Sequence, residues 1–127
     1  MSVSSNSELK QWLESNNITE VECIFPDMAG SSKGKILPVN RFIKSVEDQG
    51  LKLADSVLGQ TVSGSWINES EVIDYVEEDV IMIPDLSTIR KIPWNKEPTA
   101  QIICDLYYNS VSPSDIAPRQ ILKNMIK

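Results

Sequence analysis

The stretch from Thr19 to Val39 constrains the fold more than any other part of this sequence. Apolar and polar residues alternate over Thr19–Phe25, which is the pattern of a strand with one buried face. Pro26–Ser32 then supplies a proline, an aspartate suited to an Asx turn and a glycine, after which Lys33–Val39 again has strand character. Two strands joined by such a turn predict an antiparallel hairpin. The buried face of its first strand carries Val21, Cys23 and Phe25.

Three segments have apolar side chains at helical spacing. The first is Ser7–Asn16, with Ser7 as the expected N-cap, and the second runs from a capping Asn40 to Gly50 at the C′ position. The third begins with Pro118 as its first helical residue. The expected buried stripes are Leu9, Trp12 and Leu13; Phe42, Ile43 and Val46; and Ile121, Leu122, Met125 and Ile126.

The third helix extends to Lys127 without a C-terminal cap. An amphipathic helix of about ten residues is marginal by itself and needs a surface to pack on. We therefore expect the chain to be cut within a helix whose partner surface belongs to a longer protein.

Three further strands are expected in the second half of the chain. Val80–Ile83 is short and wholly apolar, and Thr88–Ile92 follows it and stops at Pro93. Ala100–Tyr107 has apolar residues on both faces, which is typical of an interior strand. The earlier stretch Leu51–Asn68 is rich in Gly, Ser and Thr, and we expect it to be a long ordered loop.

This order of elements predicts an α+β fold with a mixed sheet covered by helices on one face. The architecture that we expect is the β-grasp, a ubiquitin-like roll. A chain of 127 residues is long enough for one such domain around a single core.

Charge and hydropathy argue against two classes of partner. The net charge is −6, whereas nucleic-acid binding depends on Lys and Arg side chains that neutralise phosphates. No apolar run approaches the roughly 18 residues of a membrane-spanning helix, and the N-terminus has no signal-peptide pattern. We expect a cytoplasmic protein that binds neither nucleic acid nor membranes.

Few residues in this chain are suited to catalysis. Histidine is absent, which removes the commonest general base, and Cys23 and Cys104 lie in apolar strands where a thiol acts as a small buried hydrophobe. The run Glu69–Asp79 holds six acids, but we interpret it as a solvated surface because spacing alone does not make carboxylates converge on a cation. We expect no catalytic residue and no metal site here.

The hairpin turn contains residues with simple structural explanations. Asp27 and Gly30 are typical turn residues. Lys33 and Lys35 are expected to be solvated strand positions or partners of an acidic neighbour rather than phosphate ligands.

Two ordered blocks of sequence nevertheless resemble a known family. The first block is Asp27-x-x-Gly30-x-x-Lys33-Gly34-Lys35 followed by Pro38. The second block is Asp79-Val80-x-Met82-x-Pro84-Asp85-x-Ser87-Thr88-x-Arg90-x-x-Pro93-Trp94. Together with Ala100–Asp105 and Ala117–Leu122, these blocks resemble the N-terminal β-grasp domain of the glutamine synthetase family.

The resemblance implies an ATP-dependent ligase that joins the side-chain carboxylate of glutamate to ammonia or an amine, with ATP and Mg or Mn as cofactors. It places the nucleotide, metal and glutamate sites in a larger catalytic domain, so we expect no cofactor in this fragment. It also implies a homo-oligomeric ring, in which this domain packs against the catalytic domains of its own and the neighbouring subunit. Residues 1–113 would be the β-grasp domain, and 114–127 a linker and the start of the catalytic domain.

The resemblance further implies that Ser56–Trp66 is a loop that closes the neighbouring subunit's active site. Its candidate substrate-binding residues are Gly59, Gln60, Ser63, Ser65 and Trp66. Ammonia-using members carry an Asp-Gly-Ser-Ser run in this loop, and alignment on Trp66 puts Gly59 at the aspartate position. A carboxylate there stabilises ammonium and accepts its proton, so its absence favours a bulkier amine, as in γ-glutamylamine ligases.

Functions of different classes remain open at this point. The leading hypothesis is a domain that is inactive alone and serves a ligase through subunit packing and closure of the active site. The alternative is a stand-alone ubiquitin-like protein-interaction module, because a fold does not determine a function. A small-molecule sensor that uses the Gly59–Trp66 loop is supported only by the length of that loop.

Overall fold

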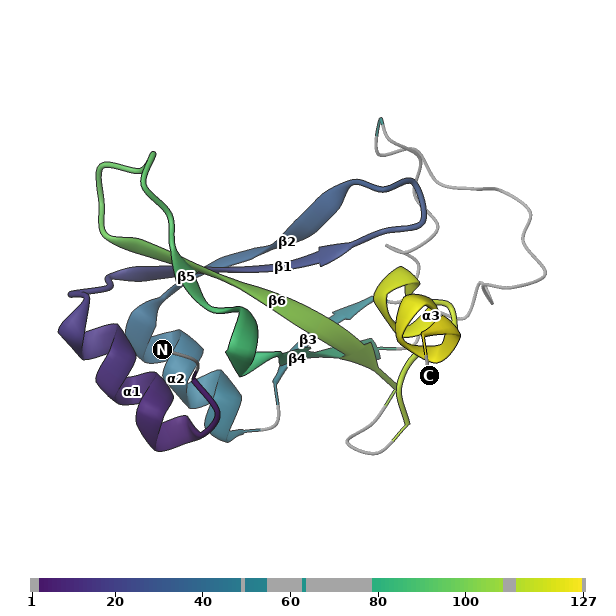
Figure 1. The fold of residues 1–127 in the computed structure, drawn as a ribbon, viewed down its shortest axis with the longest axis horizontal. Coiled ribbons are helices and arrows are strands. Elements are labelled where there is room, and N and C mark those ends of the chain that lie inside the picture. Colours follow the sequence, from purple (N-terminus) through teal and green to yellow (C-terminus); the bar gives the residue numbers. More distant parts are fainter. Residues whose placement is uncertain (1–2, 49, 55–62, 64–78, 109–111, 127) are drawn as a thin grey trace.

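A computed structural model describes residues 3–48, 50–54, 63, 79–108 and 112–126, and Figure 1 shows their arrangement. The elements in chain order are α1 (Asn6–Ser15), β1 (Glu20–Pro26), β2 (Ser32–Pro38), α2 (Val39–Glu47), β3 (Leu51–Ala54), β4 (Asp79–Pro84), the 3-10 helix η2 (Leu86–Thr88), β5 (Arg90–Lys91), β6 (Thr99–Tyr107) and α3 (Pro118–Met125). Helices and strands of this kind confirm the predicted α+β fold.

The strands form one mixed sheet in the order β2-β1-β6-β4-β3, with β5 paired to β6 beside this path. β1 and β6 are parallel, and the other pairs are antiparallel. β6 therefore lies inside the sheet, as its apolar residues on both faces predicted. This arrangement is consistent with a β-grasp-like fold.

The core lies between one face of the sheet and two helices (Figure 1). Alternate residues of β1 and β6 are almost completely buried, namely Val21, Cys23, Phe25, Ala100, Ile102, Cys104 and Leu106. Leu9 and Leu13 of α1 and Phe42 of α2 are equally buried and belong to the same cluster. Burial of this apolar surface is the main favourable contribution to folding. In β1 the buried face is the one that the alternating sequence pattern predicted.

The predicted hairpin is confirmed, with Glu20 of β1 opposite Pro38 of β2. Gly34 lies close against the backbone of β1. A Cβ atom at this position would be 1.8 Å from the carbonyl oxygen of Cys23. Position 34 therefore requires glycine, because any side chain would push β2 away from β1.

Helix α1 begins earlier than predicted. Its N-cap is Ser5, whose hydroxyl oxygen accepts a hydrogen bond from the backbone N–H of Glu8 at 3.3 Å. The expected cap, Ser7, lies inside the helix. Both serines suit the N-cap position, and the carbonyl of Ser5 also accepts the N–H of Leu9, which makes Ser5 the first residue to bond into the helix.

Helix α2 follows the hairpin without a side-chain cap, and the predicted cap Asn40 is an internal residue. The N–H of Val39 instead donates to the carbonyl of Thr19 at 2.9 Å, so backbone replaces the expected side chain. Gly50 was predicted at the C′ position, but the C-cap is Asp48, so Gly50 lies one position further along the chain than C′. Its φ of +100° and its hydrogen bond to the carbonyl of Ser45 at 2.6 Å still close the end of the helix.

Two predicted segments differ from the structure. The start of the expected loop is a strand, β3, whose residue Leu51 pairs with Met82 of β4. Thr88–Ile92 is not a continuous strand, because Thr88 belongs to η2 and β5 is only two residues long. There the carboxylate of Asp85 accepts the N–H of Ser87 at 3.2 Å, which favours a turn over a strand.

Helix α3 begins at Pro118 as predicted. Its apolar side chains are exposed, with 46% for Ile121, 59% for Leu122, 78% for Met125 and 75% for Ile126. The predicted apolar stripe thus exists, but none of the described elements covers it. Among the described residues, no helix has the length and apolar character needed to cross a membrane.

Candidate functional site

Two acidic and two basic residues join α3 to the sheet, and we call them the α3 cluster: Asp85, Asp105, Arg119 and Lys123. Arg119 contacts both carboxylates, with Nη2 at 2.6 Å from Oδ2 of Asp85 and Nη1 at 2.9 Å from Oδ1 of Asp105. Lys123 places Nζ at 2.6 Å from Oδ2 of Asp105. One helix is therefore tied both to β6 and to the residue that follows β4.

Local structure positions both carboxylates. Asp105 alternates with the buried Cys104 and Leu106 along β6, so its side chain points to the face of the sheet opposite the main core. Asp85 directly follows β4, and its Oδ1 accepts hydrogen bonds from the N–H of Ser87 at 3.2 Å and from its hydroxyl at 2.6 Å. The other oxygen of Asp85 remains directed at Arg119.

The electrostatics of the α3 cluster favour ionised partners. Burial alone raises the pKa of Asp85, but hydrogen bonds from Ser87 and Arg119 outweigh it and leave this pKa below its ordinary value. Burial likewise lowers the pKa of Arg119, and the two neighbouring carboxylates outweigh it and raise the pKa. Asp85 and Arg119 are therefore charged at neutral pH, and their contact is an ion pair rather than a site of proton transfer.

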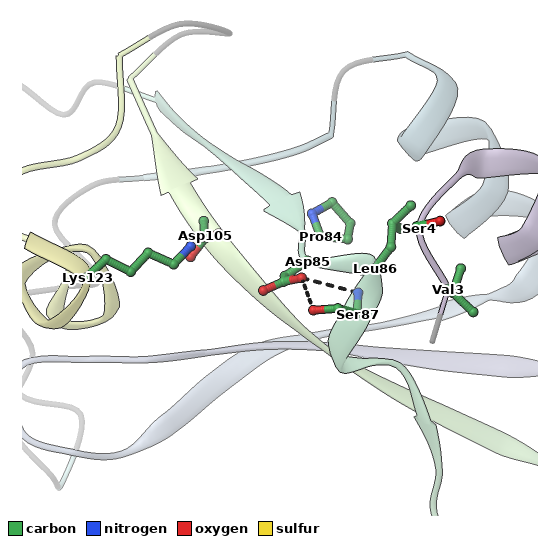
Figure 2. Close-up of a pocket in the computed structure, with 8 residues that line it drawn as sticks. All are labelled: Val3, Ser4, Pro84, Asp85, Leu86, Ser87, Asp105 and Lys123. Carbon is green, nitrogen blue, oxygen red and sulfur yellow. Dashed lines mark hydrogen bonds and ion pairs between the residues drawn. The ribbon is translucent and has the colours of Figure 1, made fainter. Parts of the chain in front are cut away.

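A cavity of about 450 Å³ borders the α3 cluster (Figure 2). Its lining consists of Val3, Ser4, Pro84, Asp85, Leu86, Ser87, Asp105 and Lys123. Figure 2 shows Asp85 hydrogen-bonded to Ser87 and the side chain of Lys123 extending from α3 to Asp105. The two carboxylates at this cavity are thus already bound to cationic side chains.

The chemistry of the lining does not fit the ATP and divalent metal of the ligase that the resemblance implies. Both carboxylates are committed to Arg119 or Lys123, whereas a hard cation needs several free oxygen ligands directed at one point. In the part of the chain that the structure describes, no group of three or more Cys, Asp or Glu residues could hold a metal ion. The geometry of the α3 cluster is suited to joining elements.

The hairpin turn confirms the structural interpretation of Asp27 and Gly30. Asp27 is 1% exposed, and its Oδ1 accepts the backbone N–H groups of Ala29 at 3.0 Å and Ser31 at 2.8 Å. Its Oδ2 lies 2.7 Å from Nζ of Lys33, so Asp27 is the acidic partner that was expected for this lysine. Burial raises the pKa of Asp27, but these contacts outweigh it and lower the pKa overall. Gly30 has a φ of +79°, which lies in the left-handed region that favours glycine and is typical of a turn residue.

Lys35 is an exposed position of β2, as predicted. Its Nζ donates to the backbone carbonyl of Lys52 at 2.9 Å rather than to an acidic side chain. Lys35 lies on β2 and Lys52 on β3, which are the two ends of the strand order. The contact shows that the sheet is curled enough to bring its outer strands within reach of one side chain.

The two cysteines are buried and free, as predicted. The hydrogen bond with Cys23, followed by burial, raises the pKa of the Cys104 thiol. A thiol that holds its proton at neutral pH is a poor nucleophile. The structural interpretation of Cys104 therefore agrees with its environment.

Most of the predicted loop site lies outside the described residues. This applies to Gly59, Gln60, Ser65 and Trp66, and to the acidic run before Asp79. Ser63 is described as an exposed turn residue. The substrate-binding role of this loop therefore stays a prediction.

Sequence reasoning did not predict the α3 cluster. Asp85, Asp105 and Arg119 all lie within the motif segments, and two of them follow a proline, as in Pro84-Asp85 and Pro118-Arg119. Their shared location depends on how β4, β6 and α3 pack together. No spacing along the chain expresses that arrangement.

No protein-family model matches this chain. The chain is 26% identical to the glutamate–isopropylamine ligase of Pseudomonas sp, over 94% of this chain and 26% of that protein. It is 33% identical to the gamma-glutamylethanolamide synthetase GlnA4 of Streptomyces coelicolor, again over 94% of this chain and 26% of that protein. It is 28% identical to a glutamine synthetase of Methanocaldococcus jannaschii, over 92% of this chain and 25% of that protein. The chain thus spans about a quarter of the length of these curated relatives.

A solved structure of GmaS, in its apo form without ligand, has a similar fold. The TM-score is 0.67 at 21% sequence identity, and the match covers 91% of this chain and 24% of that one. The likeness supports the β-grasp-like arrangement of sheet and helices.

Proposed function

This chain is homologous to proteins of the glutamine synthetase family, and we propose that it is the N-terminal β-grasp domain of an ATP-dependent ligase. The ligase joins the side-chain carboxylate of glutamate to ammonia or an amine. The observation that carries the proposal is the coverage of the relatives, because proteins named as ligases or synthetases match more than nine tenths of this chain with about a quarter of their own length.

The contribution of this domain to the ligase is structural. ATP, Mg or Mn and glutamate bind to the larger remainder of the protein, which begins within residues 114–127. The domain packs against the catalytic domains of its own and the neighbouring subunit in a homo-oligomeric ring in the cytoplasm, and Ser56–Trp66 closes the neighbour's site. The ion-paired carboxylates of the α3 cluster support this division, since they are used to hold elements together.

The acceptor that we propose is an amine rather than ammonia. By the resemblance, alignment on Trp66 puts Gly59 at the position of the aspartate that activates ammonium in the ammonia-using members. The names of two relatives, the glutamate–isopropylamine ligase and the gamma-glutamylethanolamide synthetase, describe amine chemistry for those proteins. A third relative is named a glutamine synthetase, so the family contains both kinds of acceptor.

The first test uses the 127-residue chain alone. It is incubated with ATP, glutamate, Mg²⁺ or Mn²⁺, and ammonia or an amine, and phosphate release is measured. We expect no release above the background without protein. Turnover that depends on glutamate would contradict the assignment of catalysis to another domain.

The second test concerns the acceptor. A ligase that contains this domain is assayed with ammonia and with a panel of primary amines, in the wild type and in a Gly59→Asp variant. We expect the wild type to prefer an amine and the variant to shift its preference toward ammonia. A wild type that prefers ammonia would show that position 59 does not determine the acceptor.

A further inference from the structure

We propose that Arg119 is a positioning residue that fixes the orientation of α3 relative to the sheet. Arg119 acts through the carboxylates of Asp85 and Asp105, which belong to two different segments of the sheet region. The proposal deepens the proposed function. Only the importance of Arg119 for a ligase rests on that proposed function. The contacts themselves are a property of this chain.

Apart from its N-cap Ala117, which is buried in the core cluster, helix α3 has few other means of holding its place. It is eight residues long, its N-cap Ala117 makes no side-chain hydrogen bond, and none of its own residues is buried. A helix of this length is unstable without tertiary contacts. Since little apolar surface of α3 is buried against the sheet, polar contacts must provide much of its attachment.

The guanidinium of Arg119 provides two anchor points. Its Nη2 lies 2.6 Å from Asp85 and its Nη1 lies 2.9 Å from Asp105, so the planar group is held at both ends. One contact would leave the helix free to rotate about it, whereas two contacts in different directions define an orientation. The side chains of Arg119, Asp85 and Asp105 are only 22%, 25% and 13% exposed, which limits screening by solvent.

The two anchor points are themselves held by the surrounding structure. Asp85 is hydrogen-bonded to Ser87 at the start of η2, and Asp105 lies within the central strand β6. Lys123 is one turn after Arg119, on the same side of α3, and adds a contact to Asp105 at 2.6 Å. Its side chain is 39% exposed, so we expect it to contribute less than Arg119.

In the ligase proposed above, α3 leads from the sheet into the remainder of the protein. A helix fixed by Arg119 would move together with the sheet as one body. The sheet would then set the direction in which the following domain starts. This consequence is separate from the test below, which needs no catalytic activity.

The experiment measures hydrogen–deuterium exchange of the complete 127-residue chain, in the wild type and in an Arg119→Gln variant. We expect the amides of α3 to lose protection by about tenfold in the variant, since two charge-assisted hydrogen bonds are removed. Amides of β1 and β6 should exchange as in the wild type. Arg119→Lys keeps the charge without the planar fork and should lose protection in α3 by an intermediate factor.

Arg41→Gln on α2 is the matched control, because Arg41 is an exposed arginine outside the α3 cluster. It should leave the exchange of α3 unchanged. Unaltered protection of α3 in Arg119→Gln would overturn the proposal, and so would an equal loss throughout the sheet, which would make Arg119 a general contributor to stability. Either result leaves the phosphate-release and acceptor tests standing, so the two proposals fail independently.

Discussion

Gly34 shows how one residue without a side chain determines the spacing of two strands. A Cβ atom would lie 1.8 Å from the Cys23 carbonyl oxygen, a backbone atom that cannot move without the strand. We expect Gly34→Ala to lower the free energy of unfolding by roughly 2–4 kcal/mol, measured by urea denaturation.

Gly30→Ala is the comparison, because nothing lies within 4 Å of a Cβ built there. Gly30→Ala should lower the free energy of unfolding only because of the φ of +79° at this position. A residue other than glycine in this conformation costs about 1–2 kcal/mol. If Gly34→Ala lowered the free energy of unfolding no more than Gly30→Ala does, this would contradict the close approach of β1 and β2 at Gly34.

Asp27 makes the stability of the hairpin depend on pH. Its pKa in the folded state is below the ordinary value of about 3.9, so its contribution is complete above that value and is lost as the pH falls through the folded-state pKa. We expect Asp27→Asn to cost about 1–3 kcal/mol at pH 7, because it removes the charge that binds Lys33. The difference from wild type should shrink at pH 3.

Thermal unfolding of both proteins at pH 7 and pH 3 measures this difference. Asp48→Asn, at an exposed carboxylate, controls for the general effect of removing one negative charge. A gap between wild type and Asp27→Asn that is the same at both pH values would show that ionised Asp27 does not stabilise the turn.

Two buried hydroxyl groups have opposite environments. Ser114 is completely buried, and its hydroxyl has no hydrogen-bond partner among the described residues. Thr99 is also completely buried, but its hydroxyl donates to the carbonyl of Glu97 at 3.0 Å. Removing an unsatisfied hydroxyl should cost little, whereas removing a satisfied one loses a hydrogen bond.

We therefore expect Ser114→Ala to change the free energy of unfolding by less than about 0.5 kcal/mol or to raise it, and Thr99→Val to lower it by about 1 kcal/mol. Denaturant titration of the two variants measures both values. A larger loss for Ser114→Ala than for Thr99→Val would mean that the Ser114 hydroxyl does have a partner.

At the scale of elements, the sequence predicted the helices and strands whose formation depends mainly on neighbouring residues. The hairpin, the interior strand β6 and the start of α3 at Pro118 follow from alternation, turn residues and a helix-starting proline. β3 was not predicted, because its four residues become a strand only by pairing with β4, far along the chain. The start of α2 differed for a similar reason, since the backbone of Thr19 replaced its expected cap.

A side chain of the 3-10 helix η2 forms hydrogen bonds that link this helix to β6. The hydroxyl of Thr88 accepts the N–H of Ile103 at 2.9 Å and donates to the carbonyl of Asp85 at 2.7 Å. We expect Thr88→Val to destabilise the protein by about 1–3 kcal/mol, since it leaves the N–H of Ile103 without this acceptor while keeping the shape of the side chain. The carbonyl of Asp85 keeps the backbone N–H of Thr88 at 3.0 Å as a donor.

Thr88→Ser is the matched variant, because it keeps the hydroxyl and removes the methyl group. It should cost less than about 1 kcal/mol in the same denaturation experiment. An equal cost for the two variants would assign the effect to packing of the methyl group instead of the hydrogen bonds.

At the scale of the whole molecule, the fold was more predictable than the site. The family resemblance directed attention to Gly59–Trp66, of which the structure describes only Ser63. The α3 cluster was missed because Asp85, Asp105 and Arg119 come from three separate segments. Each residue is unremarkable in the sequence, and only the docking of α3 on the sheet brings their charges together.

The exposed face of α3 predicts how the whole chain behaves in solution. Leu122 and Met125 are 59% and 78% exposed on one short helix, together with two neighbouring isoleucines. Apolar side chains grouped in this way favour contacts between molecules. We expect the weight-average mass from sedimentation equilibrium to rise with protein concentration, and the rise to weaken in a Leu122→Gln/Met125→Gln variant.

Ile36→Gln is the control, because Ile36 is 63% exposed and lies on β2 rather than on α3. It should leave the association unchanged, whereas an equal effect would place the contact on the edge of the sheet. A wild-type chain that stays monomeric at the highest concentration would contradict the prediction. Because Arg119 holds α3 against the sheet, Arg119→Gln should also alter this association while leaving the apolar side chains themselves intact.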